Sequence, residues 1–175
     1  MPASVIKAVP TVSSEPPHVA EGLRRYDDIA RQLEDLLAKL WAAPAAPRKA
    51  HKSIPQTPGV YLFTEARKPI YVGQTRKLRN RLRAHTIPSA SQEQASFAFL
   101  LAKKQAEQRK VVVTGTRQFV ARHLDFVPLF KDAKERVANM DVRFIEIPEP
   151  DVRTIFEVYA SLALDTGEFN SFETH

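Results

Sequence analysis

The amino-acid sequence predicts an α+β fold, with a small, mainly antiparallel sheet of three strands flanked by helices. Two short β-prone runs, residues 60–63 and 70–72, are separated by a segment of hairpin length. A third run, residues 141–147, alternates apolar and polar side chains as a half-buried strand does. Elsewhere, apolar residues recur at spacings of three and four, which is typical of amphipathic helices. A chain of 175 residues has room for one such domain with a core of its own.

The chain before the hairpin is expected to lie outside the sheet domain. Residues 1–20 are rich in Pro, Ser and Val and have no helical or strand period, which predicts a mobile tail. Residues 21–42 carry apolar side chains at helical spacing and predict a single amphipathic helix. This helix either packs on its own domain or dimerises as a short coiled coil. Repeated prolines interrupt residues 43–57 and predict a stiff connector.

A compact domain is expected over residues 58–175, with a helical insertion at about 86–140. The first helix follows the hairpin directly, and Thr75 is its candidate N-cap because a threonine hydroxyl can accept a hydrogen bond from the first turn. Pro150 stands where proline is tolerated, in the first turn of the last helix. The expected helices cover residues 75–85, 92–109, 116–124 and 151–164.

Positive charge is concentrated in one part of the sequence. The net charge is +6 and the isoelectric point is near 9.7. Residues 66–92 hold seven Lys and Arg and no acidic residue, whereas residues 111–175 hold more Asp and Glu than Lys and Arg. The net charge alone would suit a nucleic acid or an acidic membrane surface equally well, whereas its concentration is what a phosphate-contacting face is expected to show.

The absence of cysteine excludes several kinds of chemistry. With no cysteine in the sequence, disulfides, thiolate catalysis and cysteine-based zinc sites are all ruled out. The sequence also has no apolar run of signal-peptide or membrane-span length. We therefore expect a cytoplasmic protein without a membrane partner.

Two tyrosines are bracketed by glycines in the predicted hairpin. Gly59 precedes Tyr61 by two residues, and Gly73 follows Tyr71 by two residues. Short strands at this spacing bring the two phenols onto neighbouring strands, and strand alternation puts Phe63 on the face of Tyr61. The alternative is that both tyrosines are β-formers that pack a half-buried sheet.

Two further features are candidates for chemistry. Lys77, Arg81 and His85 stand at successive i+4 positions and predict one polar row on the helix after the hairpin. The row could bind phosphate, but its arginines could equally form a solvated face, and His85 could interact with the helix dipole. Glu157 lies in an otherwise apolar stretch of the last helix, where it is either exposed or turned inward as a ligand.

The order and spacing of these residues resemble the GIY-YIG nuclease family over residues 58–171. Gly-Val-Tyr, then Tyr-Val-Gly ten residues later, then Arg81 after ten more, match the family's pattern, with valine in place of isoleucine. Glu157 and Asn170 are similar to the family's metal-binding glutamate and closing asparagine, and His85 corresponds to a histidine found in part of the family, notably its restriction endonucleases. The chain is identified as a stand-alone, bacterial-type member with no subfamily assigned.

The resemblance implies a metal-dependent endonuclease that hydrolyses phosphodiester bonds in DNA with one metal ion. Glu157 would bind Mg²⁺, with Mn²⁺ as a substitute. Tyr61 would orient or deprotonate the attacking water, which requires nearby cations to favour the phenolate, and Arg81 would neutralise charge on the phosphoryl oxygens. Tyr71 and His85 would position the water or phosphate or relay a proton, and Asn170 would fix the site by hydrogen bonds. The basic residues expected to contact nucleic acid are Arg76, Lys77, Arg79, Lys103 and Lys104.

Substrate choice and partners stay open at this point. DNA is the expected partner, with RNA as an alternative, and no zinc finger or helix-turn-helix signature is visible. Specificity would come from residues 86–140, from the helix at 21–42, from a homodimer formed through that helix, or from a separate partner protein. Restriction, repair and defence roles are all compatible with the sequence, and His85 favours the first. The alternative function is a nucleic-acid-binding module that keeps the fold without cutting.

Overall fold

The computed structural model describes residues 18–46 and 51–170. The chain divides into two units, residues 1–32 and residues 33–175, and each is described by itself. The expected mobile tail at residues 1–20 falls almost wholly outside the described residues. Its last two residues already belong to the first helix, α1, at Val19–Ala30. No helix in the described ranges is long and apolar enough to cross a membrane.

The single helix expected over residues 21–42 is two helices, α1 and α2, and α2 covers Leu33–Ala42. Gln32 explains the break between them. Its side-chain Nε2 donates to the carbonyl oxygen of Asp28 at 2.8 Å. Its backbone N–H, which would reach that carbonyl in a continuing helix, donates to Ile29 instead. A local side-chain bond therefore replaces one rung of the helix and ends α1.

The predicted three-stranded sheet is confirmed. Strands β1 (Gly59–Glu65), β2 (Lys68–Thr75) and β3 (Asp141–Glu146) lie in the order β2-β1-β3, and both pairs are antiparallel. The turn from β1 to β2 has positive φ at both of its residues, Ala66 and Arg67, which suits the right-handed twist of a two-residue hairpin. Since β2 is an edge strand, half of its backbone groups need partners outside the sheet.

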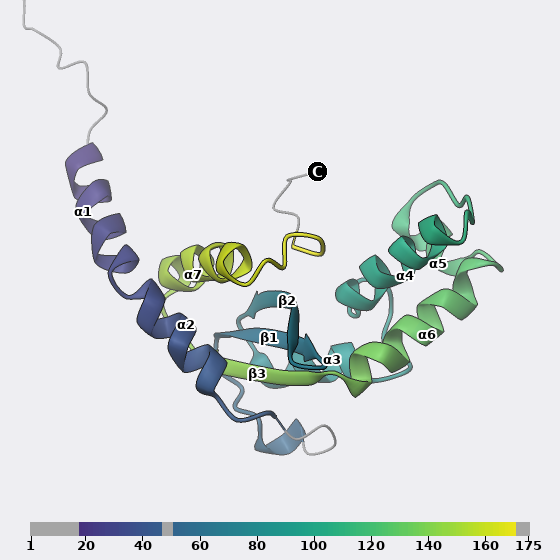
Figure 1. Cartoon of the computed structure of the whole chain (residues 1–175), viewed down its shortest axis with the longest axis horizontal. Coiled ribbons are helices and arrows are strands. Elements are labelled where there is room, and N and C mark those ends of the chain that lie inside the picture. Colours follow the sequence, from purple (N-terminus) through teal and green to yellow (C-terminus); the bar gives the residue numbers. More distant parts are fainter. Residues whose placement is uncertain (1–17, 47–50, 171–175) are drawn as a thin grey trace, which may run out of the picture. The chain divides into compact units, whose positions relative to one another are not determined.

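Each face of the sheet is covered by helices. Opposite Tyr61 in β1 lies Gly73 in β2, and opposite Phe63 lies Tyr71, so these residues share a face, as predicted for Tyr61 and Phe63. That face belongs to a core shared with α3 (Leu78–Thr86) and the helices after it. Leu62 points to the other face and is also fully buried, on the side where α7 (Pro150–Ala163) and α2 contact the sheet. Figure 1 shows α7 passing along the sheet.

The helix α3 begins at Leu78, three residues later than expected, because the chain before β1 caps it. The N–H groups of Leu78 and Arg79 donate to the carbonyls of Thr57 and Pro55 at 3.0 and 3.1 Å. Thr75 does not cap the helix, and its hydroxyl accepts from the N–H of Lys77 instead. The described residues 51–57 are therefore not a free-standing spacer.

Other contacts also join the predicted connector to the domain. It contains a short 3₁₀ turn, His51–Ser53, and the N–H of Ala46 donates to the carbonyl of Val142 in β3 at 2.7 Å. Ile54 is 2% exposed and belongs to the core on the tyrosine face. The segment predicted as a connector thus packs on the sheet and positions α3.

The segment between α3 and β3 forms a helical layer of its own. It contains α4 (Ser96–Gln108), α5 (Arg117–Arg122) and α6 (Phe126–Asn139), and Figure 1 shows α4 and α6 side by side. The first two lie inside the ranges expected for helices, whereas α6 was not predicted. Its buried residues follow a helical period that the sequence does contain: Phe126, Leu129, Phe130, Ala133 and Val137.

Candidate active site

Tyr61 lies in the middle of β1 and is fully buried, and Gly73 makes room for it. The two residues are directly opposite each other in the β1–β2 pair. A Cβ atom at position 73 would lie 2.4 Å from Oη of Tyr61 and 2.5 Å from its Cζ. The glycine of the second tyrosine motif is therefore needed so that the phenol of the first can lie across β2.

Tyr71 comes from the neighbouring strand to the same place. Its ring centre is 6.2 Å from that of Tyr61, as the hairpin spacing predicted. Its ring also stacks on Phe97 of α4, with centroids 4.5 Å apart and planes inclined by 10°. Tyr71 is half-buried, so the helical layer fixes its orientation without closing the site over it.

Arg81 connects the tyrosines to the helical layer. Its Nε donates to Oη of Tyr61 at 3.1 Å. Its Nη1 donates to the carbonyl of Gln94 at 3.1 Å and its Nη2 to Oγ of Ser96 at 2.6 Å. Tyr71 also acts on the guanidinium group, which carries five N–H donors, so at least one donor stays available for a ligand. The alternative of a solvated face does not hold for this half-buried arginine.

His85 is buried and electrically neutral, so the predicted polar row is wrong. Its Nε2 is 3.2 Å from Oη of Tyr61, and Nδ1 has no hydrogen-bond partner within the described part of the chain. Burial and then the charge of Arg81 lower the pKa of His85 to about 3. Lys77, at the other end of the row, is exposed at the N-cap of α3. A neutral ring cannot interact with the helix dipole as a cation, which removes that alternative too.

Burial keeps both phenols protonated. It is the largest cause that raises the pKa of Tyr61 far above its ordinary value of 10, and the neighbouring Tyr71 adds to the effect. Burial also raises the pKa of Tyr71. The hydrogen bond and charge of Arg81 act in the opposite direction on Tyr61 and do not outweigh burial. The expectation that nearby cations make Tyr61 a phenolate is therefore not met by the protein's own groups.

Glu157 and Asn170 lie along the open edge of β2. Oε1 of Glu157 accepts from the N–H of Gln74 at 3.0 Å. The side-chain amide of Asn170 pairs with the backbone of Val72, accepting from its N–H at 3.0 Å and donating to its carbonyl at 2.6 Å. Both side chains thus satisfy edge groups that no strand pairs. This role agrees with the expectation that Asn170 fixes the site by hydrogen bonds.

Two residues that hold α7 against this edge were missed in the sequence. The side chain of Gln74 accepts from Nε of Arg153 at 3.1 Å and donates to Thr154 at 3.3 Å. Arg153 is 5% exposed and also donates to the carbonyl of Ile147 at 3.0 Å. An arginine in an otherwise apolar helix was visible in the sequence, but no spacing related it to Gln74.

Glu157 is electrostatically coupled to the other site residues. Burial raises the pKa of its carboxyl, and the bond from Gln74 and the charge of Arg81 lower it. Its own charge raises the pKa values of Tyr61 and Tyr71. The side chains predicted to act together therefore converge, and Glu157 is turned inward rather than exposed on a polar stripe.

The carboxylate fits a single hard cation. The described residues contain no cluster of three or more His, Asp or Glu side chains able to hold a metal. Mg²⁺ in phosphate chemistry often takes only one or two carboxylates and fills its other positions with water and phosphate oxygens. A half-buried carboxylate close enough to Arg81 to feel its charge suits that coordination, and a cation would offset the cost of its burial.

The basic residues expected to bind nucleic acid differ in their exposure and in their contacts with the rest of the protein. Arg76, Lys77 and Lys103 are exposed. Arg79 donates its Nε to the carbonyl of Ile54 at 2.7 Å and thereby ties α3 to the chain before β1. Lys104 forms an ion pair with Glu168 and lies 5.3 Å above the ring of Phe169. The last two are held in place by the protein itself.

Comparison with known proteins agrees with this geometry. Residues 57–120 match a family model described as a UvrC-like GIY-YIG domain. This segment of the chain is similar to the GIY-YIG family. Tyr61, Tyr71, Arg81 and His85 fall inside the matched GIY-YIG segment, whereas Glu157 and Asn170 come after it, so their place in the site rests on the structure.

Curated relatives share this GIY-YIG segment. The chain is 37% identical to the UvrABC system protein C of Desulfotalea psychrophila over 76 residues, which are 43% of this chain and 12% of that protein. It is 34% identical to the protein of the same name from Thermotoga maritima over 71 residues, 41% of this chain and 12% of that protein. The match to the Thermotoga petrophila protein is 24% identical over 129 residues and covers 66% and 22% of the two chains.

These relatives are much longer proteins. The chain spans no more than 22% of the length of any of the three. No solved structure matches the chain. The comparisons therefore show a GIY-YIG-like segment in the chain, and the activity of the whole relatives is not carried over with it.

Acid is expected to destabilise the protein through His85. Its pKa is about 3 in the folded state and about 6.5 when unfolded, so the unfolded chain binds more protons between these values. The free energy of unfolding should fall as the pH drops below about 6.5, by at most about 1.4 kcal/mol per pH unit for this group. Urea unfolding between about pH 6.5 and 5 measures the slope, and His85→Gln should remove part of it. An equal reduction in His123→Gln, at a half-exposed histidine, would show that burial of His85 is not the cause.

Replacement of Asn170 by alanine is expected to lower the free energy of unfolding by about 2–3 kcal/mol. The substitution leaves the N–H and the carbonyl of Val72 without partners at a buried position. Chemical denaturation measures the loss. Asn139→Ala is the matched control, since that exposed side chain makes one bond, to the carbonyl of Glu135. Equal losses in the two variants would mean that Asn170 does not support β2.

Proposed function

We propose that this protein is a metal-dependent endonuclease that hydrolyses phosphodiester bonds in DNA with a single divalent cation, Mg²⁺ or Mn²⁺. The observation that carries the proposal is the convergence of Tyr61, Arg81 and Glu157 from three separate elements on one place at the edge of β2. The basic run that includes α3 lies beside it, which suits a polyanionic substrate. The match of residues 57–120 to a UvrC-like GIY-YIG domain supports this class of enzyme.

Glu157 would hold the cation. When bound, a divalent cation supplies Lewis-acid polarisation of a phosphoryl oxygen and stabilises charge on the leaving oxygen. The hydrogen bond from Gln74 fixes one oxygen of the carboxylate and thereby its direction. Since the protein offers one carboxylate here, the remaining ligands would be water and the phosphate itself.

Arg81 would bind the phosphate. At least one of its five N–H groups is available, and three others are fixed by Tyr61, Gln94 and Ser96, so it is held ready for the charge that builds up in the transition state. A donor that needs no rearrangement during the reaction stabilises that charge most effectively. The same bonds keep Arg81 within reach of the phenol.

Tyr61 would orient the attacking water as a neutral phenol and accept a proton from it only as its own proton moves on. Its Oη is 3.2 Å from Nε2 of His85, a neutral ring nitrogen that can receive that proton. Tyr71 would support the water or phosphate from the adjacent strand. A transient relay avoids a stable phenolate, which the buried site disfavours.

The alternative function is a DNA-binding module that keeps the fold without cutting, and the raised pKa of Tyr61 is the observation in its favour. Supercoiled plasmid and branched duplex DNA incubated with Mg²⁺, Mn²⁺ or EDTA distinguish the two, with binding measured in parallel. We expect cleavage with either cation and none in EDTA or in Glu157→Ala. Tight binding without cleavage under every condition would favour the binding module.

A further inference from the structure

A second arginine reaches the same site from the helical layer. Arg117 is the first residue of α5, far from the tyrosine motifs in sequence. Its guanidinium carbon lies 4.4 Å above the ring of Phe99 in α4, and its Nη2 donates to the carbonyl of Ser96 at 3.3 Å. Stacking on an aromatic ring leaves the edge of a guanidinium group free for a bidentate ligand.

Ser96 brings this arginine to Arg81. Its hydroxyl accepts from Nη2 of Arg81 at 2.6 Å, and its carbonyl accepts from Nη2 of Arg117. The two guanidinium groups are thus attached to the same residue, the first of α4. Burial is the largest cause that lowers the pKa of Arg117, and the charge of Arg81 lowers it too. The charges of the two arginines therefore act on each other.

This pair of like charges is only weakly compensated. In the described ranges, neither guanidinium forms an ion pair with a carboxylate. Glu93, the acidic group that acts on Arg117, is exposed. Arg81 is half-buried and Arg117 is exposed, so a ligand can reach the pair from solvent. A backbone phosphate, with its several oxygens, can accept from both and would offset their repulsion.

We propose that Arg117 is a second phosphate ligand, which with Arg81 clamps one phosphate of the DNA backbone beside the two tyrosines. This gives residues 86–140, the segment whose role the sequence left open, a direct part in substrate binding. The inference rests on the proposed function because it assumes that DNA is the substrate. It adds a residue outside the tyrosine and arginine motifs on which that proposal is built.

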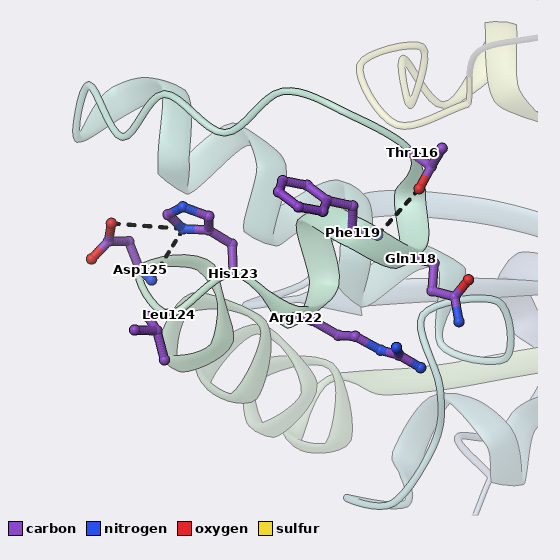
Figure 2. Close-up of a pocket in the computed structure, with 7 residues that line it drawn as sticks. All are labelled: Thr116, Gln118, Phe119, Arg122, His123, Leu124 and Asp125. Atoms are coloured by element: carbon purple, nitrogen blue, oxygen red, sulfur yellow. Dashed lines mark hydrogen bonds and ion pairs between the residues drawn. The ribbon is translucent and has the colours of Figure 1, made fainter.

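The affinity for DNA at different salt concentrations tests the clamp. A fluorescein-labelled duplex is titrated in EDTA, over several NaCl concentrations, with wild type, Arg117→Gln and Arg122→Gln. Arg122 is the matched control, an exposed arginine on the same helix that lines a separate surface pocket of about 590 Å³ (Figure 2). We expect Arg117→Gln to bind about tenfold more weakly and its salt slope to fall by about 0.9. Arg122→Gln should stay within about twofold of wild type with an unchanged slope.

An unchanged salt slope in Arg117→Gln would overturn the clamp, even if the affinity fell. Loss of a residue with only a structural role weakens binding but leaves the number of counterions released from the DNA unchanged. Equal losses in both variants would overturn it as well. Arg117→Met, which keeps an aliphatic contact with Phe99, replaces the glutamine variant if that does not fold. The binding assay contains no metal, so its outcome does not depend on cleavage. If the wild type fails to cleave DNA in the separate cleavage assay, the nuclease proposal fails, and the salt slope still decides whether the clamp exists.

Discussion

The single-turnover rate of DNA cleavage is expected to fall by at least about 100-fold when Arg81 is replaced by alanine. The substitution removes the guanidinium group proposed to bind the phosphate, and with it the bond that holds Oη of Tyr61. It also separates α3 from Gln94 and Ser96, so the site loses its connection to the helical layer. A quenched-flow or gel assay with saturating enzyme measures the chemical step directly.

Arg83→Ala is the matched control for this prediction. Arg83 is exposed on the same helix, so its replacement removes one positive charge without touching the site. Its cleavage rate is expected to stay within about threefold of wild type, since one exposed charge acts mainly on substrate encounter. If Arg81→Ala and Arg83→Ala cleave at similar rates, Arg81 does not act at the phosphate.

Gly73→Ala is expected to abolish cleavage and to destabilise the fold by about 1–3 kcal/mol. The added Cβ would lie 2.4 Å from Oη and 2.5 Å from Cζ of Tyr61, closer than atoms in real proteins approach. The phenol cannot turn away easily, because it is fully buried between Phe63 and His85. Either the ring is displaced from Arg81 or the β1–β2 pair opens, and both outcomes break the site.

The matched substitution for Gly73 is Gly167→Ala. A Cβ at position 167 would meet no atom within 4 Å, and its backbone does not lie in the left-handed region. Thermal unfolding and cleavage by Gly167→Ala should match wild type. If Gly73→Ala also matched wild type in both measurements, the explanation of the second glycine as space for the first tyrosine would be wrong.

Strand alternation and motif spacing were sufficient to predict the sheet face that carries the tyrosines. The register that places Gly73 opposite Tyr61 follows from a two-residue turn at Ala66 and Arg67 together with a shift of register between Phe63 and Thr64. Neither the turn length nor the shift could be read from a segment without Gly or Asn. The antiparallel sheet was therefore predictable, whereas the reason for its second glycine became clear only from the structure.

The burial of His85 shows what helix patterns leave undecided. Leu78, Leu82 and His85 stand at i, i+4 and i+7, which is one apolar stripe, and the structure buries all three. The spacing from Lys77 through Arg81 to His85 was equally visible and suggested a polar row. Only packing against Phe63 and Phe97 decides between the two, and those contacts join separate elements.

The place of Glu157 could not be derived from its own helix. Its bond to Gln74 depends on β2 being an edge strand, and the position of α7 depends on Arg153 and Asn170 reaching the same edge. The family resemblance pointed to Glu157 as a site residue. Nothing in that resemblance predicted the contact between Arg117 and Ser96. Such contacts between distant segments are set by tertiary packing rather than by local propensity.

The most direct test of the nuclease proposal is the cleavage rate as a function of Mg²⁺ concentration for wild type, Glu157→Gln and Glu149→Gln. Glutamine keeps the size of the side chain and its bond from Gln74 but removes the charge that would hold the cation. Glu149, exposed just before α7, is the control. We predict saturable Mg²⁺-dependent cleavage by wild type and Glu149→Gln, and none by Glu157→Gln although it still binds DNA in EDTA. Cleavage by Glu157→Gln at the wild-type rate would contradict the assignment of the metal to Glu157.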